Sequence, residues 1–474
     1  MKVVSLTNPV TSKWLTDQGF RLDPAPYLSG ALEARMLLER LPNTMTLENV
    51  TAGIFHAGRF SRRWVQDPDH GIPFFSSTDI LEVDFSYLPL VAKNAAAENP
   101  RLLIEPGWTL ITRSGTVGRI AYARPDVDGF ACSEHVLRVV PNSKKIPSGY
   151  LYTFLRSRYG VPMIASSAYG AIIQHIEPDH IADLPVPRFD AELEKRIHRM
   201  AEISARLRAR FQAALVAATE DFFTSVGLPE LIDLRWHQQE RDLGFEVEGV
   251  GPTSLRALNF APRAQRLIEK LGSVPSKTLG EICAGGQLGS GVRFKRIDTD
   301  PEHGVQLVGQ RQGFWLRPEG RWISAEQAPH GIFAQDETVM IAAQGTLGEN
   351  EVFCRPLFVT GSWLNYVYTQ HFLRVVSADA EVPGAYLFAF LRSEAAFRLL
   401  RSMSVGGKQQ DIHETLRAGI PIPLAAPEDR HRIAETVRRA YRNRDRADAL
   451  EDQALALLTK AIEEAAATKK EAAV

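Results

Sequence analysis

Short apolar runs separated by Gly, Pro, Asn and Asp make up most of residues 46–183. Three of these runs are residues 72–75, 108–112 and 135–140. Runs of this length that are bounded by turn-forming residues are typical of β-strands. The pattern therefore predicts a body of short strands.

Helical periodicity interrupts the strands at two places. One helix is expected at residues 32–41, and a second at residues 148–159, where Tyr152, Leu155 and Tyr159 fall on one face. Helices and strands that alternate in this way predict a mixed α/β body.

Two long amphipathic helices are also predicted, one at residues 192–223 and one that follows residue 423. Their apolar residues recur at steps of three and four, which is typical of a coiled-coil seam. Since neither helix can bury its stripe alone, we expect the two to pack on each other. The first stripe comprises Leu193, Ile197, Met200, Leu207, Phe211, Leu215, Ala218 and Phe222, and the second comprises Ile433, Val437, Ala440, Ala447, Leu450, Ala454, Leu457 and Ile462.

The stretch at residues 135–156 returns almost unchanged at residues 371–392. His-Val-Leu-Arg-Val-Val in the first copy reads His-Phe-Leu-Arg-Val-Val in the second, and both copies continue into Tyr-Leu-x-x-x-Leu-Arg-Ser. The offset is 236 residues (371 − 135). Solenoid repeats are only about 20–50 residues long, so the chain contains two copies of a whole domain.

The duplication predicts the order of the segments. We expect an α/β protein with two duplicated mixed α/β domains, each followed by a long helix, and a coiled-coil spine made by the two helices. The predicted segments are residues 1–187 (first domain with an N-terminal entry segment), 188–226 (first helical region), 227–262 (linker), 263–423 (second domain) and 424–474 (second helical region).

Composition places the chain among ordinary globular proteins, with 45% hydrophobic and 23% charged residues. We expect neither a membrane span nor a secretory signal. Three scattered cysteines without Cys-x-x-Cys spacing fit a reducing, cytoplasmic setting. A formal net charge of −1 does not indicate a nucleic-acid binder, although seven arginines gather within residues 430–446.

Paired glycines follow apolar strands in both copies, as Gly-Thr-Val-Gly at residues 115–118 and Gly-Thr-Leu-Gly at residues 345–348. Such glycines allow a tight turn and a close approach of the backbone to a ligand. A purely structural turn explains them equally well. They are not a phosphate-binding loop, because the lysine of the P-loop is missing.

Cations cluster ahead of an Asp-Pro-x-His-Gly turn in each copy, with aromatic residues between them. This combination suits contact with phosphates or bases, and a solvated charged strand is the alternative. The histidines of the turns have no further ligand at metal spacing, so no metal site is expected. The cations are Arg59, Arg62 and Arg63 in the first copy and Arg293, Lys295 and Arg296 in the second.

Polar stretches that begin at Tyr169 and Gly406 precede the Pro-x-Pro segment of each copy. Gln can read adenine through paired hydrogen bonds, and Lys can read guanine. Because these stretches differ between the copies, the two halves would bind different targets. A plain surface loop is the alternative reading.

Catalytic signatures are missing from the sequence. We find no Asn-Pro-Pro-Tyr-type methyltransferase motif, no Gly-x-Ser-x-Gly, no His-Glu-x-x-His and no nuclease carboxylate cluster. This favours a binding protein over an enzyme. A duplicated scaffold that binds no DNA is the alternative from another class.

The order of these motifs, given twice, resembles the specificity subunits of Type I restriction-modification enzymes. The resemblance extends from about residue 32 to about residue 466 and implies two target recognition domains, each reading half of a bipartite, asymmetric DNA sequence. It also implies helical regions that dock two DNA methyltransferase subunits, and restriction subunits where these exist. Related recognition domains serve other methylation-based phage-defence systems.

The resemblance implies that this chain is non-catalytic and binds no cofactor itself. S-adenosylmethionine would belong to the methyltransferase partner, and ATP and Mg²⁺ to the restriction partner. The predicted DNA-binding residues are Arg59, Arg62, Arg63, Arg113, Thr116, Tyr169, Gln174, Arg293, Lys295, Arg296, Arg311, Gln344, Thr346, Lys408, Gln409 and Gln410. The predicted partner-binding residues are Ile197, Leu207, Phe211, Val437, Leu450 and Leu457.

Overall fold

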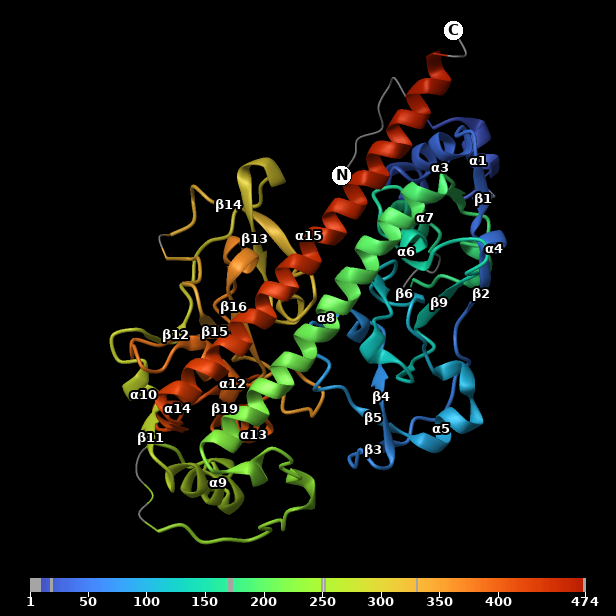
Figure 1. The fold of residues 1–474 in the computed structure, drawn as a ribbon. Coiled ribbons are helices and arrows are strands. Elements are labelled where there is room, and N and C mark those ends of the chain that lie inside the picture. Colours follow the sequence, from blue (N-terminus) through green and yellow to red (C-terminus); the bar gives the residue numbers. More distant parts are fainter. Residues whose placement is uncertain are drawn as a thin grey trace. The chain divides into compact units, whose positions relative to one another are not determined.

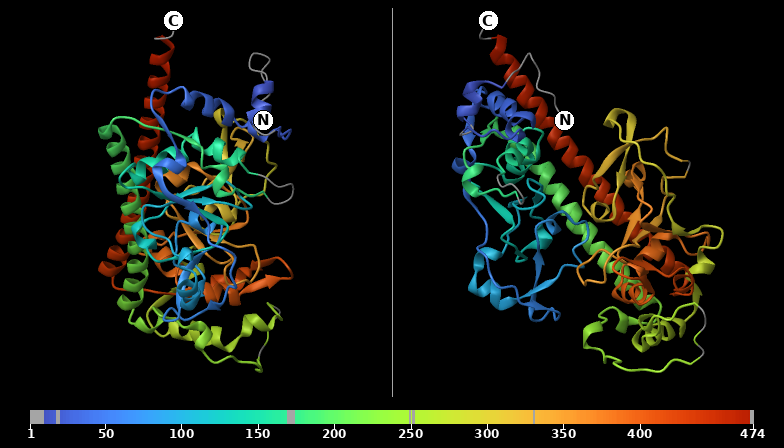
Figure 2. Two further views of the ribbon diagram at one scale, coloured as in Figure 1. Left: turned by 90° about the vertical axis from the view of Figure 1, so that its right-hand side faces the viewer. Right: turned by 180° about the vertical axis from the view of Figure 1, so that it is seen from behind.

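The computed structural model describes residues 10–17, 20–168, 174–248, 250, 253–329 and 331–471. They pack into two units, shown in Figures 1 and 2. Unit 1 consists of the described residues within Met1–Glu82, Leu88–Ala209 and Arg446–Val474, and unit 2 consists of those within Val83–Tyr87 and Arg210–Asp445.

The main sheet of unit 1 is antiparallel and has the strand order β2-β9-β6-β7. Its central strands are the apolar runs of the sequence, and their side chains are almost all buried. The strands are β2 (Thr51–Phe55), β6 (Thr109–Thr112), β7 (Ile120–Tyr122) and β9 (Val136–Pro141).

A second sheet of unit 1, with the order β3-β5-β4-β8, has its own small core around Phe74 and Val91. Its strands are β3 (Trp64–Val65), β4 (Gly71–Phe75), β5 (Leu90–Ala92) and β8 (Ala131–Cys132). The other elements of unit 1 are α1 (Ser12–Asp17), α2 (Ala25–Leu28), α3 (Ala31–Glu39), β1 (Thr44–Thr46), α4 (Leu47–Val50), α5 (Lys93–Glu98), α6 (Ser148–Arg156), α7 (Gly160–Ser166) and β10 (Pro185–Pro187).

Unit 2 repeats this plan. Its main sheet has the order β12-β18-β15-β16, and a smaller sheet has the order β14-β13-β17. The strands are β11 (Ser276–Thr278), β12 (Gln287–Ser290), β13 (Gly304–Val308), β14 (Gly320–Ser324), β15 (Thr338–Ala342), β16 (Pro356–Val359), β17 (Val367–Tyr368), β18 (Phe372–Val376), β19 (Ser404–Gly406), β20 (Gln410–Ile412) and β21 (Pro421–Pro423). The helices are α9 (Pro262–Gly272), α10 (Leu279–Ile282), α11 (Gln310–Gly313), α12 (Gly384–Leu391), α13 (Glu394–Ser402) and α14 (Glu414–Ala418).

Both Pro-x-Pro segments form a short strand that pairs antiparallel with the strand at the start of its domain, β1 with β10 and β11 with β21. The tyrosine of the repeated Tyr-Leu motif holds each segment in place. The hydroxyl of Tyr150 donates to the carbonyl of Pro187 (2.6 Å), and that of Tyr386 donates to the carbonyl of Pro423 (2.9 Å).

Two long helices, α8 (Ala191–Ser225) and α15 (Pro427–Glu471), each contribute to both units. In unit 1, Ser204 donates to the carbonyl of Ala447 (2.9 Å). In unit 2, the ring centroids of Phe211 and Tyr441 lie 5.1 Å apart. The predicted packing of the two helices on each other is therefore confirmed, as is the mixed α/β fold class (Figures 1 and 2).

The helix predicted at residues 148–159 is shorter than expected. It ends at Arg156, because the Oγ atom of Ser157 accepts hydrogen bonds from the backbone N–H groups of Tyr159 and Gly160 (both 3.2 Å) and starts a new helix, α7. A Cβ atom at Gly160 would lie 2.4 Å from the carbonyl oxygen of Leu155, so the turn requires glycine.

The polar stretch predicted as a loop at residues 406–410 is a β-hairpin made by β19 and β20. Gly406, with φ of +98°, permits the turn. The predicted domain boundaries stay a prediction, because packing shows which segments share a core and not which segments recognise a target.

Candidate functional site

A network of polar side chains lies where two strands of the main sheet of unit 1 end and begin. Ser114 stands two residues after β6, and His135 directly precedes β9. The Oγ atom of Ser114 lies 3.1 Å from Nδ1 of His135 and 2.7 Å from Nδ1 of His175. We call this network, with the two residues described next, cluster 1.

Glu134 and Arg62 complete cluster 1. Arg62 donates to Oε2 of Glu134 (3.0 Å), while Oε1 of the same carboxylate lies 3.5 Å from Nε2 of His135. The guanidinium of Arg62 also lies 5.4 Å from the ring centroid of Phe74. A carboxylate thus separates the arginine from the imidazole.

Unit 2 has a network at the same strand ends, which we call cluster 2. Gln344 stands two residues after β15, and His371 directly precedes β18. The Oε1 atom of Gln344 faces Nδ1 of His371, and its amide nitrogen donates to Asp411 (3.4 Å). Arg296 donates to Oε1 of Gln370 (2.7 Å).

The two clusters correspond position by position. Glu134, His135 and His175 are each 236 residues before Gln370, His371 and Asp411. Upstream, the shifts of the glycine loop and the charged turn place Ser114 opposite Gln344 and Arg62 opposite Arg296. Histidine and arginine are thus shared, whereas Ser, Glu and His in cluster 1 become Gln, Gln and Asp in cluster 2.

Burial keeps both histidines neutral. Desolvation lowers the pKa of His135, against the opposing effect of Glu134, and it also lowers the pKa of His371. The carboxylate of Glu134 is also desolvated, but a hydrogen bond from its own backbone N–H and one from Arg62 outweigh desolvation and lower its pKa. At neutral pH, cluster 1 therefore contains a charged carboxylate beside a neutral imidazole.

Several predicted residues of unit 1 lie beside cluster 1, but Arg113 is committed to the fold. Its Nε donates to the carbonyl of Ile176 (3.1 Å), and one Nη binds Glu177. Thr116 and Gln174 are exposed in the segments next to Ser114 and His175. Arg59 and Arg63 are exposed near Arg62 in an irregular segment rather than the strand considered above, and Tyr169 lies outside the described residues.

In unit 2, the hairpin tip brings predicted residues to cluster 2. Lys408 and Gln409 are exposed, and the amide of Gln409 donates to Oε1 of Gln344 (3.3 Å). Gln410 differs from the prediction of a flexible surface residue. It is 6% exposed, and its side chain accepts from Arg256 (2.6 Å) while its backbone pairs with Gly345.

Four further predicted residues of unit 2 lie around this cluster. Thr346 is exposed in the glycine loop next to Gly345. Arg311 lies in α11, whose first residue, Gln310, exchanges hydrogen bonds with the backbone of Gln344 (2.7 and 3.2 Å). Arg293 and Lys295 are exposed near Arg296.

The central residues of both clusters, His135 and His371, were missed by the sequence-based prediction. A signal was present, since these histidines open the duplicated stretch and are identical in both copies. The outward-facing partners Ser114, His175 and Asp411 carry no such signal, because they differ between the copies. Only their contacts place them in the site.

The predicted partner-binding residues divide into two groups. Ile197, Leu207, Phe211 and Val437 are buried in the cores that α8 and α15 share within the units. Leu450 and Leu457 are half-buried. These two remain the candidates for contact with a partner.

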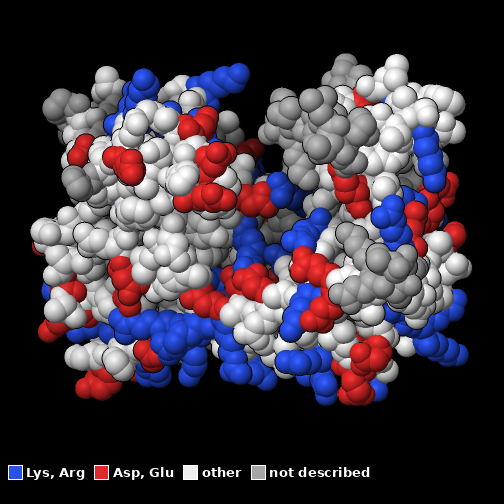
Figure 3. Space-filling model, turned by 90° about the horizontal axis from the view of Figure 1, so that it is seen from above, with Lys and Arg blue, Asp and Glu red and all other residues white. Residues whose placement is uncertain are grey.

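The arginines of residues 430–446 are largely neutralised within unit 2. Arg432 pairs with Asp221 (2.7 Å), Arg438 with Glu337 (2.5 Å) and Arg430 with Glu381 (3.0 Å). In the view of Figure 3, basic and acidic side chains are interspersed over the surface. The sequence cluster is therefore not a basic face, which corrects its interpretation as a local basic patch.

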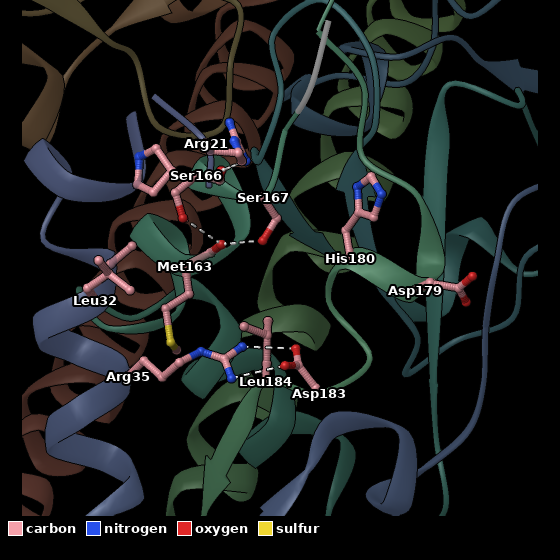
Figure 4. Close-up of a pocket in the computed structure, with 12 residues that line it drawn as sticks. Arg21, Leu32, Arg35, Met163, Ser166, Ser167, Asp179, His180, Asp183 and Leu184 are labelled. Carbon is pink, nitrogen blue, oxygen red and sulfur yellow. Dashed lines mark hydrogen bonds and ion pairs between the residues drawn. The ribbon is translucent and has the colours of Figure 1, made fainter. Parts of the chain in front are cut away.

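A pocket of about 410 Å³ in unit 1 is lined by α3, α7 and the segment at residues 179–184 (Figure 4). Its cations are already paired. Arg35 forms two hydrogen bonds with Asp183 (2.9 and 3.0 Å), and Arg21 donates to the carbonyls of Ser166 and Ala168 (2.9 and 3.0 Å). Two satisfied guanidinium groups leave the pocket without an evident anion site.

No group of three or more His, Cys, Asp or Glu side chains in the described part of the chain could hold a metal ion. Within the same residues, no helix is both long and apolar enough to cross a membrane.

Comparisons with known proteins give structural neighbours only. No family model matches the chain. No curated protein matches it either. The solved structures that it resembles include the S subunit of a Type I restriction-modification system from M. genitalium (13% identity, 90% of this chain and 94% of that chain, TM-score 0.35).

Two more neighbours have the same character. One is the HsdS subunit from Thermoanaerobacter tengcongensis (15% identity, 89% of this chain and 97% of that chain, TM-score 0.27). The other comes from a structure of complex assembly and conformational transition in the type I R-M system (15% identity, 89% and 98%, TM-score 0.27). These neighbours are of the kind that the sequence motifs predict. Because all three TM-scores are below 0.5, we base the function on the chain's own residues.

Proposed function

We propose that the chain is the specificity subunit of a Type I restriction-modification system, which recognises a bipartite, asymmetric DNA target and docks DNA methyltransferase subunits. The observation that carries this proposal is the pair of corresponding clusters. Two units with one scaffold present different hydrogen-bonding groups at the same strand ends. That arrangement suits two related readers of two different half-sites.

The exposed residues around each cluster supply the chemistry that DNA requires. In unit 2, Lys408 and Gln409 stand at the hairpin tip, where they can reach base edges, while Arg293 and Lys295 supply charge for phosphates. In unit 1, Gln174 takes the place of the hairpin tip. Base contacts give specificity, and phosphate contacts give affinity that depends on salt.

The helices offer the surface for protein partners. Leu450 and Leu457 are half-buried on α15, and Ile203 on α8 is 43% exposed. Apolar side chains on a helix surface suit packing by a partner helix. S-adenosylmethionine would be held by the methyltransferase subunits, and ATP and Mg²⁺ by restriction subunits where these are present.

The test is methylation in cells that contain this chain and a methyltransferase subunit. Sequencing of modified bases should reveal one motif of two unlike halves separated by an unread spacer. The purified chain alone, incubated with S-adenosylmethionine and DNA, should transfer no methyl group. Methyl transfer by the chain alone would contradict the proposal, as would a palindromic or uninterrupted motif, and no DNA binding in the complex would favour a scaffold.

A further inference from the structure

We propose that His135 and His371 present opposite hydrogen-bonding polarity at Nε2, a donor in unit 1 and an acceptor in unit 2, and act as specificity-determining residues for the two half-sites. This inference rests on the proposed function, because it assigns the difference between half-sites to particular atoms. The tautomers themselves follow from the clusters alone.

The network of cluster 2 fixes the tautomer of His371. Asp411 can only accept, so the amide nitrogen of Gln344 must face it and Oε1 must face His371. The amide of Gln409 also donates to that Oε1 (3.3 Å). The Nδ1 atom of His371 therefore carries the proton, and Nε2 of the neutral ring is an acceptor.

Gln370 independently supports this assignment. Arg296 can only donate, so it requires Oε1 of Gln370 on its side (2.7 Å). This turns the amide nitrogen of Gln370 toward Nε2 of His371, at 3.5 Å. A donor that faces Nε2 requires an acceptor there, which agrees with the proton on Nδ1.

Cluster 1 gives the opposite result. A carboxylate oxygen of Glu134 faces Nε2 of His135 at 3.5 Å, so Nε2 carries the proton. The Nδ1 atom then accepts from the hydroxyl of Ser114 (3.1 Å), which in turn accepts from Nδ1 of His175 (2.7 Å). The chain of hydrogen bonds is complete with every proton assigned.

One pair of residues therefore sets the polarity. Arg62 and Arg296 donate to position 134 in unit 1 and to position 370 in unit 2, so the arginine anchor is common to both. The side chain between anchor and histidine is Glu in one unit and Gln in the other. Exchange of a carboxylate for an amide of the same shape reverses what faces Nε2.

The imidazole edges are available to a ligand. The side chain of His135 is 39% exposed, and His371 is half-buried. In the major groove, guanine and thymine present acceptors, whereas adenine and cytosine also present amino donors. A donor at His135 favours guanine or thymine, and an acceptor at His371 favours adenine or cytosine, at one position of each half-site.

The tautomers can be measured without DNA. Nitrogen-15 chemical shifts of histidine-labelled full-length protein at neutral pH should place the proton on Nε2 of His135 and on Nδ1 of His371. Glu134→Gln should move the proton of His135 to Nδ1, and Gln370→Glu should move that of His371 to Nε2. The control Glu177→Gln removes a carboxylate that pairs with Arg113 and His56 instead, and it should leave His135 unchanged.

The same variants test specificity in the complex with a methyltransferase subunit. Selection from a library of randomised half-sites should show that Glu134→Gln changes the preferred base at one position of one half-site, by about two- to twelvefold for one hydrogen bond. Gln370→Glu should do the same in the other half-site. Thermal unfolding of each variant verifies that it is folded.

The outcomes separate the two proposals. A complex that binds a bipartite target with unchanged base preferences in both variants would overturn the assignment of these histidines and leave the proposed function intact. The same tautomer at both wild-type histidines would also overturn it. A wild-type complex that binds no bipartite target would instead overturn the proposed function, while the tautomers would remain as assigned.

Discussion

Units 1 and 2 share their framework and differ at the clusters. Tyr150 and Tyr386 anchor the Pro-x-Pro strand in the same way. The buried Arg138 donates to the carbonyls of Ser133, Val136, Leu102 and Cys132, and Arg374, its counterpart, donates to those of Gly331, Ile332 and Phe333. At the clusters, by contrast, three of five positions change chemical type. Duplication has kept the groups that build the fold and varied the groups at the outer strand ends.

The arginine of the repeated Leu-Arg-Ser motif shows a second kind of difference. Arg156 in unit 1 pairs with Glu451 of α15 (2.6 Å), whereas Arg392 in unit 2 pairs with Asp84 (2.8 Å). Asp84 belongs to Val83–Tyr87, the short segment that packs within unit 2. The same buried cation thus uses different segments of chain to obtain its carboxylate.

Removal of either carboxylate should produce the largest effect. We expect Asp84→Ala to destabilise unit 2, and Glu451→Ala to destabilise unit 1, by about 3–5 kcal/mol each, because a buried arginine is left unpaired. Hydrogen exchange resolved by segment measures each unit separately. Asp221→Ala, which breaks the exposed pair with Arg432, is the control and should cost no more than about 1 kcal/mol. Equal destabilisation of both units by one variant would contradict the assignment of partners.

Acid should weaken unit 2 through the same residue. Desolvation opposes ionisation of Asp84, but its interaction with Arg392 dominates and lowers the pKa from 3.8 to about 2. A lowered pKa stabilises the folded state above the unfolded-state value near pH 4, and this contribution, about 2 kcal/mol, is lost as the pH falls toward 2. Unfolding of the wild type and of Asp84→Asn as a function of pH gives the difference. A parallel pH dependence in both proteins would exclude Asp84 as the cause.

The hairpin tip allows the clusters to be compared in function. Lys408→Ala or Gln409→Ala should relax only the half-site read by unit 2, at about 1–3 kcal/mol for each lost bidentate pair. Gln174→Ala should relax only the other half-site. Arg62→Ala and Arg296→Ala should weaken binding to all sequences and reduce its dependence on salt. Competition binding with half-site variants distinguishes these results, and loss of both half-sites from one tip variant would contradict independent reading.

The smallest effect is expected at the shared tyrosines. Tyr150→Phe and Tyr386→Phe each remove one buried hydrogen bond to a proline carbonyl, so each should lower the stability of its own unit by about 0.5–1.5 kcal/mol. Segment-resolved hydrogen exchange should report similar costs. A large difference between the two would show that the anchor is not equivalent in the two units.

Periodicity and repetition in the sequence predicted the framework well. The long helices and the strands around His135 and His371 follow from local patterns that occur twice. The break at Ser157 was missed, because it depends on a side-chain cap and on the close approach at Gly160 rather than on hydrophobic spacing.

The site was harder to predict than the fold. The residue types gave Arg62, Arg296, Gln344 and Gln409, which do reach the clusters. They could not show that Arg113 binds Glu177 within the fold. Burial and contacts between distant segments decide which polar residues remain available, and neither is encoded in local spacing.

The central claim is that each unit reads its own half of a bipartite target. The direct measurement is to replace residues 278–423 by the equivalent segment of a related protein, express the chimaera with the methyltransferase subunit, and sequence the methylated sites. We predict that one half-site changes while the other half-site is retained. A change in both halves, or in neither half of an active complex, would contradict the claim.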